Sequence, residues 1–214
     1  MTAILKAVNP QAKPELLRLN LGCGRNILPG WVNVDCVELP GVDLVQDLNN
    51  MHRNNGMGMA AWDVRFTENC VDQFLLSHTL EHIHNTLPLM QELYRIAKPD
   101  ALCVIRTPYG SSDDAWEDPT HVRAYFIGSW GYFSQPYYWR ADYQYRGDWQ
   151  ADSVELVVKK ELLKLSAADD LLARVHRERN IVVEMIATLR AVKPIREPKR
   201  ELQVAPKLKF VVLP

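Results

Sequence analysis

The 214-residue chain has no surplus of charge of either sign, because 25 Lys and Arg stand against 26 Asp and Glu. Proteins that bind the phosphate backbone of nucleic acids commonly carry a large basic excess, since neutralising phosphates releases bound counterions. The near balance argues against nucleic acid as the partner. The composition is otherwise ordinary, with 47% hydrophobic and 24% charged residues, and it predicts a folded core.

Cysteine is scarce, and the four cysteines form no CxxC pair. They are Cys23, Cys36, Cys70 and Cys103. Such spacing argues against a disulfide framework and against a thiolate zinc site. Long apolar runs are also missing from residues 1–17, where Lys and Pro interrupt the sequence before it reaches the length of a signal-peptide core or a membrane span. We therefore expect a soluble, cytoplasmic protein without a membrane segment.

The first half of the chain alternates between strand and helix patterns. Apolar runs bounded by polar turns predict strands at 16–22, 31–35, 42–47, 71–77 and 101–108. Over 78–99 apolar residues recur at helical spacing, in a helix that Pro88 can divide. No internal repeat is evident, and the length fits one compact domain. We expect residues 1–214 to form a single α/β domain with a Rossmann-like, doubly wound, mostly parallel sheet.

The second half begins with a change of pattern, because aromatic residues crowd into 109–149. We interpret this segment as a cap insertion with a helix that starts near Asp118 and Pro119. A strand is expected at 154–165, followed by a helix from a capping box at Ser166 to near Asn180. Residues 181–194 partly fit a helix, but their β-branched run favours a late antiparallel strand. Residues 207–214 fit an edge strand or a packed tail.

The first predicted strand runs directly into Gly22, Cys23 and Gly24. Glycine has no side chain and tolerates positive φ, so backbone at such a turn can approach a ligand closely. Asp35 ends the second strand eleven residues after Gly24, and a carboxylate there can accept both hydrogen bonds of a ribose diol. Taken singly, these residues are also typical of ordinary tight turns. The spacing lacks GxGxxG, which disfavours an NAD-dependent oxidoreductase.

Four ordered segments resemble the motifs of class I S-adenosylmethionine (SAM)-dependent methyltransferases, over residues 16–108. They are LNLGCGRNILPGWVNVD, Asp47 with Leu48, SHTLEHI and ELYRIAKPDALCVIRTP. The resemblance implies an enzyme with SAM as its cofactor.

The resemblance also implies where SAM would bind. The GCG turn would lie against the methionine part of SAM, and Asp35 would hold the ribose. Asp47 and Leu48 would flank adenine, while Ser77 and His78 would border the ligand. Asn20 stands where many members carry an acid, so it can orient the turn or bond the ligand amine without the charge attraction of a carboxylate. KPDA at 98–101 replaces the usual KPGG turn.

The acceptor side is expected beyond the carboxyl ends of the later strands, where ligands of open α/β sheets bind. Methyl transfer from a sulfonium is a direct displacement, so an enzyme mainly positions the reactants, and a hydroxyl acceptor also has to lose a proton. His82 and His121 are our candidate catalytic bases. Equally, His82 can be a helix residue bonded to backbone, and His121 a residue of a first helical turn.

HTLEH also resembles the ExxEH segment of some divalent-metal-dependent O-methyltransferases, with His78 in place of the first acid. That resemblance implies Glu81, His82 and His121 as ligands of a divalent cation. The lost oxygen ligand weakens the case for Mg²⁺, so we favour a site without metal.

No Pro-Pro-Tyr follows the fourth strand, as it commonly does in base and amide N-methyltransferases of this superfamily. No cysteine follows a proline, as the nucleophile of cytosine-C5 methyltransferases would. By elimination we predict an O-methyltransferase that acts on a small molecule, sugar or glycan. The alternative is a non-catalytic SAM-fold partner or scaffold, which would bind SAM without turnover. The aromatic segment is expected to form a lid with its own core, and it can also offer stacking and cation–π surfaces.

Overall fold

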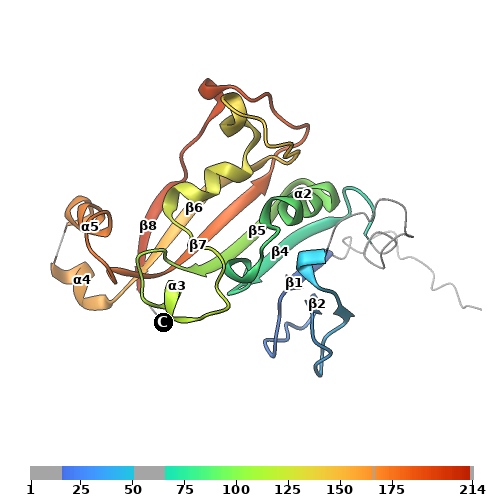
Figure 1. The fold of residues 1–214 in the computed structure, drawn as a ribbon, viewed down its shortest axis with the longest axis horizontal. Coiled ribbons are helices and arrows are strands. Elements are labelled where there is room, and N and C mark those ends of the chain that lie inside the picture. Colours follow the sequence, from blue (N-terminus) through green and yellow to red (C-terminus); the bar gives the residue numbers. More distant parts are fainter. Residues whose placement is uncertain (1–15, 51–65, 166, 213–214) are drawn as a thin grey trace, which may run out of the picture.

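The computed structural model describes residues 16–50, 66–165 and 167–212, and one mixed sheet runs through it (Figure 1). Its strands are β1 (Arg18–Leu21), β2 (Val32–Asp35), β3 (Leu44–Val45), β4 (Val71–Ser77), β5 (Ala97–Pro108), β6 (Trp149–Val158), β7 (Val182–Ala191) and β8 (Lys207–Val212). The α-helices in these residues are α2 (Thr86–Ile96), α3 (Asp114–Glu117), α4 (Lys160–Leu165) and α5 (Ala168–Val175). The 3-10 helices are η1 (Leu48–Asn50), η2 (Leu80–His82), η3 (Ile127–Phe133), η4 (Gln135–Trp139) and η5 (Arg200–Leu202).

The eight strands of the described residues lie in the order β3-β2-β1-β4-β5-β7-β6-β8. Neighbours pair in parallel except β7, which runs antiparallel between β5 and β6. The structure therefore confirms the mostly parallel sheet and the late antiparallel strand. The C-terminal segment is an edge strand, because β8 pairs with β6.

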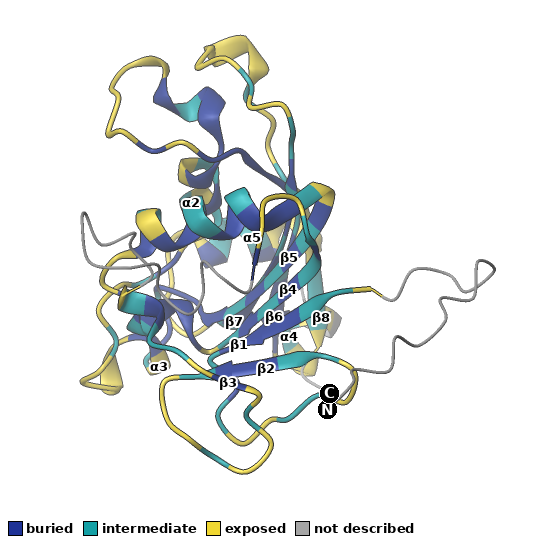
Figure 2. Ribbon diagram, turned by 90° about the vertical axis from the view of Figure 1, so that its right-hand side faces the viewer, coloured by how far each residue is buried: buried dark blue, intermediate teal, exposed yellow. Residues whose placement is uncertain are grey.

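Burial along the strands shows which face carries the core. In β5, Cys103 and Ile105 are fully buried, whereas Val104 and Arg106 are only half-buried. A period of two is that of a strand with one tightly packed face. Helix α2 packs its apolar side on this face in one hydrophobic cluster, and it lies along β4 and β5 in Figure 1. Figure 2 shows these central strands buried and the loops around β2 and β3 exposed.

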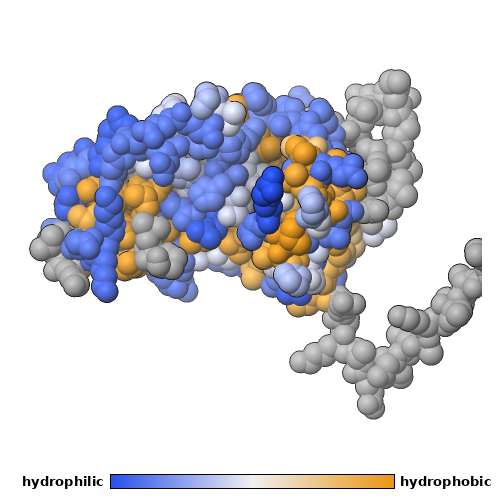
Figure 3. Space-filling model, turned by 90° about the horizontal axis from the view of Figure 1, so that it is seen from below, coloured by the Kyte–Doolittle hydropathy of each residue, from blue (hydrophilic) through white to orange (hydrophobic). Residues whose placement is uncertain are grey.

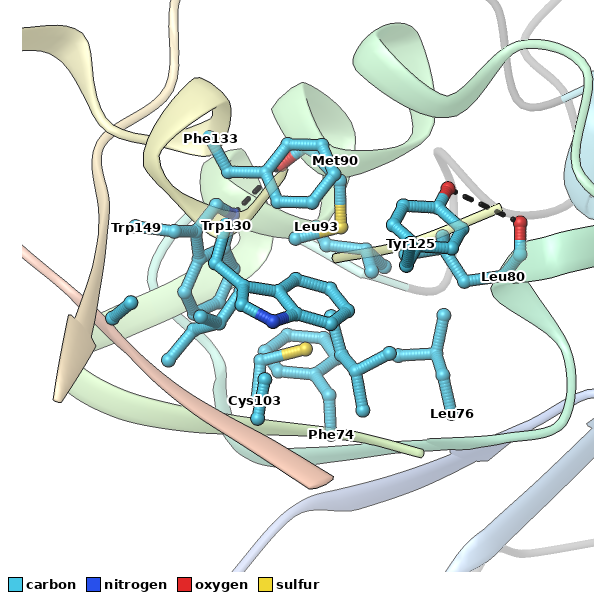
Figure 4. Packing of buried hydrophobic residues seen from close by; sticks show 14 of the residues in the cluster. Phe74, Leu76, Leu80, Met90, Leu93, Cys103, Tyr125, Trp130, Phe133 and Trp149 are labelled. Carbon is cyan, nitrogen blue, oxygen red and sulfur yellow. Dashed lines mark hydrogen bonds between the residues drawn. The ribbon is translucent and has the colours of Figure 1, made fainter. Parts of the chain in front are cut away.

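Part of the aromatic segment belongs to the main core (Figure 4). Trp130 is fully buried and stacks on Tyr125 with ring centroids 5.3 Å apart. Trp149 meets the edge of Phe74 at 5.8 Å and donates its indole hydrogen to the Met90 carbonyl at 2.9 Å. These rings therefore join the segment to α2 and the sheet. Other aromatic side chains of the segment are exposed, among them Trp116, Tyr132 and Tyr143.

The helix expected to start near Asp118 and Pro119 is a wrong prediction. Helix α3 ends at Glu117, and Asp118 has extended backbone with ψ of 115°. A residue before proline is pushed out of the helical region by the proline ring. The Asp118 carboxylate also accepts the N–H of Thr120 at 2.7 Å, a local turn that competes with helix formation. The dipeptide therefore ends one helix and does not begin another.

Other boundaries differ as well. The strand predicted over 154–165 begins earlier, at Trp149, and gives way to α4 after Val158, because the segment 160–165 is rich in helix-forming Lys, Glu and Leu. Helix α5 ends at Val175, short of Asn180, and the predicted cap Ser166 lies outside the described residues. The helix predicted over 78–99 is split between η2 and α2 at residues 83–85, and Pro88 lies in the first turn of α2, where its missing N–H costs no hydrogen bond.

The connection from β1 to β2 at residues 22–31 contains no helix. Polar side chains hold it as a loop. The Asn20 amide donates to the Asn26 carbonyl at 2.8 Å, and the Asn33 side chain accepts the Leu28 N–H at 2.9 Å. The glycine turn is therefore fixed by buried amides of the sheet. No helix in the described part of the chain is long and apolar enough to cross a bilayer.

Candidate active site

Gly22 and Gly24 both adopt left-handed backbone, with φ of +65° and +51°, but for different reasons. A Cβ on Gly22 would lie 2.4 Å from the Cγ2 of Thr79, so packing against the segment after β4 excludes any side chain there. A Cβ on Gly24 would meet nothing within 4 Å. The open space beside Gly24 is the kind of backbone surface that a ligand can approach closely.

Asp35, at the end of β2, is joined to this turn. Its Oδ2 accepts the Gly24 N–H at 2.7 Å, and its Oδ1 accepts the Val37 N–H at 3.0 Å. A carboxylate offers about four lone-pair positions, so Asp35 can hold the turn and still accept hydrogen bonds from a diol. Asn20 is buried with its amide hydrogens on Asn26 and Asn33, an arrangement that fits the prediction that it orients the turn.

A pocket of about 320 Å³ opens beside these residues. Six of the predicted site residues line it: Gly22, Asp35, Asp47, Leu48, His78 and His82. Asn20, Cys23, Gly24, Ser77 and His121 are not among its lining residues. The lining residues come from the ends of β1, β2, β3 and β4 and from the segments that follow them. Such a position is expected for a ligand pocket at the carboxyl ends of an open sheet.

The adenine-side wall of the predicted site is fixed by Asp47. Its Oδ1 accepts a hydrogen bond from the Asn49 N–H at 2.9 Å, and its Oδ2 accepts one from the Asn50 side-chain amide at 2.7 Å. Together these two bonds cap η1. Asn49 in turn accepts the His84 N–H at 2.8 Å, so η1 is tied across the pocket to the segment after η2. Leu48 is buried and supplies an apolar surface.

His78 follows β4 with a φ of +52°. Its Nε2 lies 3.0 Å from Glu184 on β7, and its Nδ1 lies 3.4 Å from Glu81. The hydrogen bond to Glu184 and then the neighbouring Glu81 carboxylate raise the pKa of His78 to about 9, against the opposing effect of burial. His78 is therefore a cation at neutral pH, and it lines the pocket.

His82 and His121 come from segments 39 residues apart, and their ring centroids are 4.7 Å apart. The Val122 N–H donates to the Glu81 carbonyl at 2.8 Å, which fastens the segment after α3 to η2. Figure 1 shows this segment at the carboxyl ends of the parallel strands. The structure thus places the two predicted bases side by side, next to the buried carboxylate of Glu81.

A second cavity, of about 420 Å³, lies on the other side of the segment after η2. Its lining is largely aromatic and polar: His84, Asn85, Thr86, Leu87, Pro88, Arg123, Ala124, Tyr125, Ser129, Tyr132, Phe133, Tyr138 and Tyr143. None of the predicted site residues lies in it.

Comparison with known proteins agrees with the geometry. Residues 19–105 match the family profile described as a methyltransferase domain. The chain has the fold of a class I SAM-dependent methyltransferase. The strands that carry the matched region are those that surround the smaller pocket.

Two solved structures illustrate the likeness. A SAM-dependent methyltransferase from Archaeoglobus fulgidus is 17% identical with a TM-score of 0.57, over 82% of this chain and 86% of its own. A provisionally assigned methyltransferase from Bacillus halodurans C-125 is 13% identical with a TM-score of 0.51, over 86% and 95%. At these identities the likeness is one of fold. No curated protein sequence matches the chain significantly.

Sequence reasoning missed Thr79, Gln46 and Asn49, which also line the smaller pocket. Thr79 donates its hydroxyl to the Leu21 carbonyl at 3.1 Å and fills the space that Gly22 leaves. The sequence shows a small hydroxyl residue directly after Ser77 and His78, but it does not show that this residue packs against Gly22 on the neighbouring strand connection.

Proposed function

We propose that the methyltransferase transfers the methyl group of SAM to a hydroxyl oxygen of a small molecule, sugar or glycan. The observation that carries this proposal is the position of His82, which lines the pocket of the SAM-motif residues and pairs with His121. SAM, when bound, supplies an electrophilic methyl group on a sulfonium. What the chain has to add for a hydroxyl acceptor is alignment and a destination for the proton.

The histidine pair has a nitrogen available for that proton. The Nδ1 of His121 faces the Ala115 carbonyl at 3.3 Å, so it carries the ring hydrogen and leaves the lone pair on Nε2. An imidazole with a free lone pair beside the SAM pocket can take the proton of a hydroxyl as the new carbon–oxygen bond forms. His82 and His121 are thus proposed to act on the acceptor and not on SAM.

The aromatic cavity is the proposed position for the body of the acceptor. It shares the segment 82–85 with the SAM pocket, since His82 lines one and His84 the other. Tyrosine rings and Arg123 offer stacking faces and hydrogen-bond donors, which suit a polyhydroxylated ring. On the side of the molecule that bears α3, apolar residues gather in two separate areas with hydrophilic residues between them (Figure 3).

The test is SAM-dependent turnover on a panel of sugars, nucleotide sugars and phenols, measured as the release of S-adenosylhomocysteine. We expect product with at least one hydroxylated acceptor. We expect His121→Ala to lower kcat by about 10²- to 10⁴-fold with nearly unchanged SAM affinity. SAM binding without turnover on any acceptor would favour a non-catalytic scaffold, and full activity of His121→Ala would remove this residue from the reaction.

Asp35 tests the SAM side separately. Asp35→Ala is expected to weaken SAM binding by about 1.5 to 3 kcal/mol, the scale of a charged hydrogen bond. Asp43→Ala is the matched control, because Asp43 also accepts a backbone N–H, that of Asn33 in β2 at 2.8 Å, but does not line the pocket. Calorimetry with SAM should separate the two variants, and equal affinities would contradict the ribose assignment.

A further inference from the structure

Resting on the O-methylation proposed above, we propose that the acceptor carries an anionic oxygen group, a phosphate or a carboxylate, and that Arg123 binds this group in the aromatic cavity. The cavity has a volume of about 420 Å³, which is within the range of pockets that hold small molecules. Among the described residues that line it, there is no Asp or Glu, and Arg123 is the only Lys or Arg. The lining therefore carries a positive charge that no carboxylate of the cavity wall balances.

The Arg123 guanidinium is available to a ligand. Its side chain is exposed, and it forms no hydrogen bond or ion pair with the part of the chain that the structure describes. Asp142 lies outside the lining, and both of its oxygens already accept hydrogen bonds from Arg146, at 2.9 and 2.8 Å. A guanidinium presents its N–H groups as a planar fork that matches two oxygens of a carboxylate or phosphate. Arg123 therefore suits an anionic group better than a neutral hydroxyl.

The two pockets differ in the sign of their charge. The smaller pocket is lined by the carboxylates of Asp35 and Asp47 and by the cationic His78, so one negative charge remains there. That sign suits a cofactor with a cationic sulfonium, whereas Arg123 gives the aromatic cavity the opposite sign. Clefts of one charge concentrate ligands of the other. The difference therefore helps to direct SAM and an anionic acceptor to separate pockets.

Helix α2 begins at the same cavity and adds to this positive charge. Asn85, Thr86 and Leu87 at its N-terminal end line the cavity. The side chain of Asn85 does not cap the helix, because its amide donates to the Asn49 carbonyl at 3.0 Å, and the first turn contains no acidic residue. The N-terminus of a helix carries a partial positive charge and N–H groups without helical partners. It therefore reinforces the preference for an anion that Arg123 sets.

Arg123 is also placed to orient the acceptor. It follows the proposed base His121 by two residues, on the segment whose Val122 N–H is fastened to the Glu81 carbonyl at 2.8 Å. Five aromatic rings line the cavity, those of Tyr125, Tyr132, Phe133, Tyr138 and Tyr143. Their faces can pack on the ring of an acceptor while Arg123 holds its anionic group. An acceptor held in this way is fixed relative to the segment that carries the base, so Arg123 would determine which acceptors are methylated.

The experiment is calorimetry of the full-length protein saturated with S-adenosylhomocysteine, with two matched sets of probes. One set is glucose 6-phosphate, glucuronate and glucose, and the other is phenyl phosphate, benzoate and phenol. Within each set the ring is kept while the phosphate, the carboxylate or neither is present, so the two anionic groups are compared with each other and with the neutral compound. We expect an anionic probe to bind at least about 10-fold more tightly than its neutral counterpart, with a preference that weakens as salt is added.

Arg123→Gln should abolish the preference for the anionic probe, whereas Arg123→Lys should retain part of it, because it keeps the charge but loses the fork. Arg174→Gln is the matched control, since it removes the same charge from α5 and lines neither the aromatic cavity nor the smaller pocket. This control should bind every probe as wild type does. The affinity for S-adenosylhomocysteine should be the same in all of these proteins, which checks that the fold and the smaller pocket are retained.

Equal binding of charged and neutral probes, no binding of any anionic probe, or a preference that persists in Arg123→Gln would overturn the anion site. Turnover of a neutral hydroxylated acceptor with the same KM in wild type and Arg123→Gln would also overturn it, while the O-methylation would stand. Arg123-dependent binding of an anionic probe without SAM-dependent turnover on any acceptor would instead support the anion site and contradict the proposed function.

Discussion

Gly22→Ala is the sharpest single test of how the glycine turn at residues 22–24 is built. The substitution introduces a Cβ 2.4 Å from the Cγ2 and 2.5 Å from the Oγ1 of Thr79. Ordinary Cβ contacts begin near 3.4 Å, so Thr79 would have to retreat by about 1 Å. A rotation of its side chain alone is insufficient, because the Thr79 Cβ also lies only 3.0 Å away.

The expected loss of folding stability in Gly22→Ala has two contributions. A left-handed, non-glycine residue costs about 1 kcal/mol or more, and overpacking of a tight site costs about 1 to 3 kcal/mol. Gly24→Ala has the first term only, because a Cβ there meets nothing within 4 Å. Gly22→Ala should therefore be less stable than Gly24→Ala by about 1 to 3 kcal/mol, although both glycines have positive φ.

Urea unfolding at 25 °C measures both variants, and a second substitution isolates the clash. Thr79→Ala removes Cγ2 and Oγ1, so the Gly22→Ala/Thr79→Ala protein should be more stable than the two single effects predict, with a coupling of about 1 kcal/mol or more. Thr79→Ala alone loses the hydroxyl bond to Leu21, worth about 1 kcal/mol. Equal stability of the two alanine variants, or additive effects in the double variant, would refute the packing argument.

Two further predictions concern charges outside the glycine turn. Arg196→Ala should destabilise the protein by about 3 to 5 kcal/mol in urea unfolding, because both oxygens of the fully buried Asp148 carboxylate accept hydrogen bonds from the Arg196 side chain at 2.7 Å. Arg190→Ala breaks a more exposed ion pair and should cost less than about 1 kcal/mol. Similar losses of stability in the two variants would contradict the role assigned to burial. Burial acts to raise the pKa of Glu184, but hydrogen bonds from His78 and Arg106 outweigh it and lower that pKa from 4.5 to about 2. Glu184 therefore contributes stability above pH 4.5 that is lost as the pH falls toward 2, about 2 kcal/mol after screening. Glu184→Gln should lose this contribution at pH 6 and approach wild type near pH 2, and a constant difference over this range would show that ionisation of Glu184 is not the cause.

The parts of the fold that were predicted correctly rest on strong local signals. The run VDQFLLS is a strand over Val71–Ser77 as expected, because an apolar run of this length between turns is typical of a strand and too short for most helices. The prediction at Asp118 and Pro119 was wrong because two local rules compete there. Proline favours a first helical turn, but it also forces the residue before it into extended backbone, and the aspartate bonds Thr120 instead of capping a helix.

The sequence by itself determined the glycine turn, the acid at the end of β2 and the α/β alternation, because each depends on neighbours along the chain. Only the tertiary structure decided that Gly22 must accommodate Thr79 and that Trp149 belongs to the core. It also brought Glu81 and His121 together across 40 positions. Such contacts depend on how β1 and β4 pair and on where the segment after α3 is fastened. Packing and hydrogen bonds between distant segments, rather than residue spacing, fix these distances.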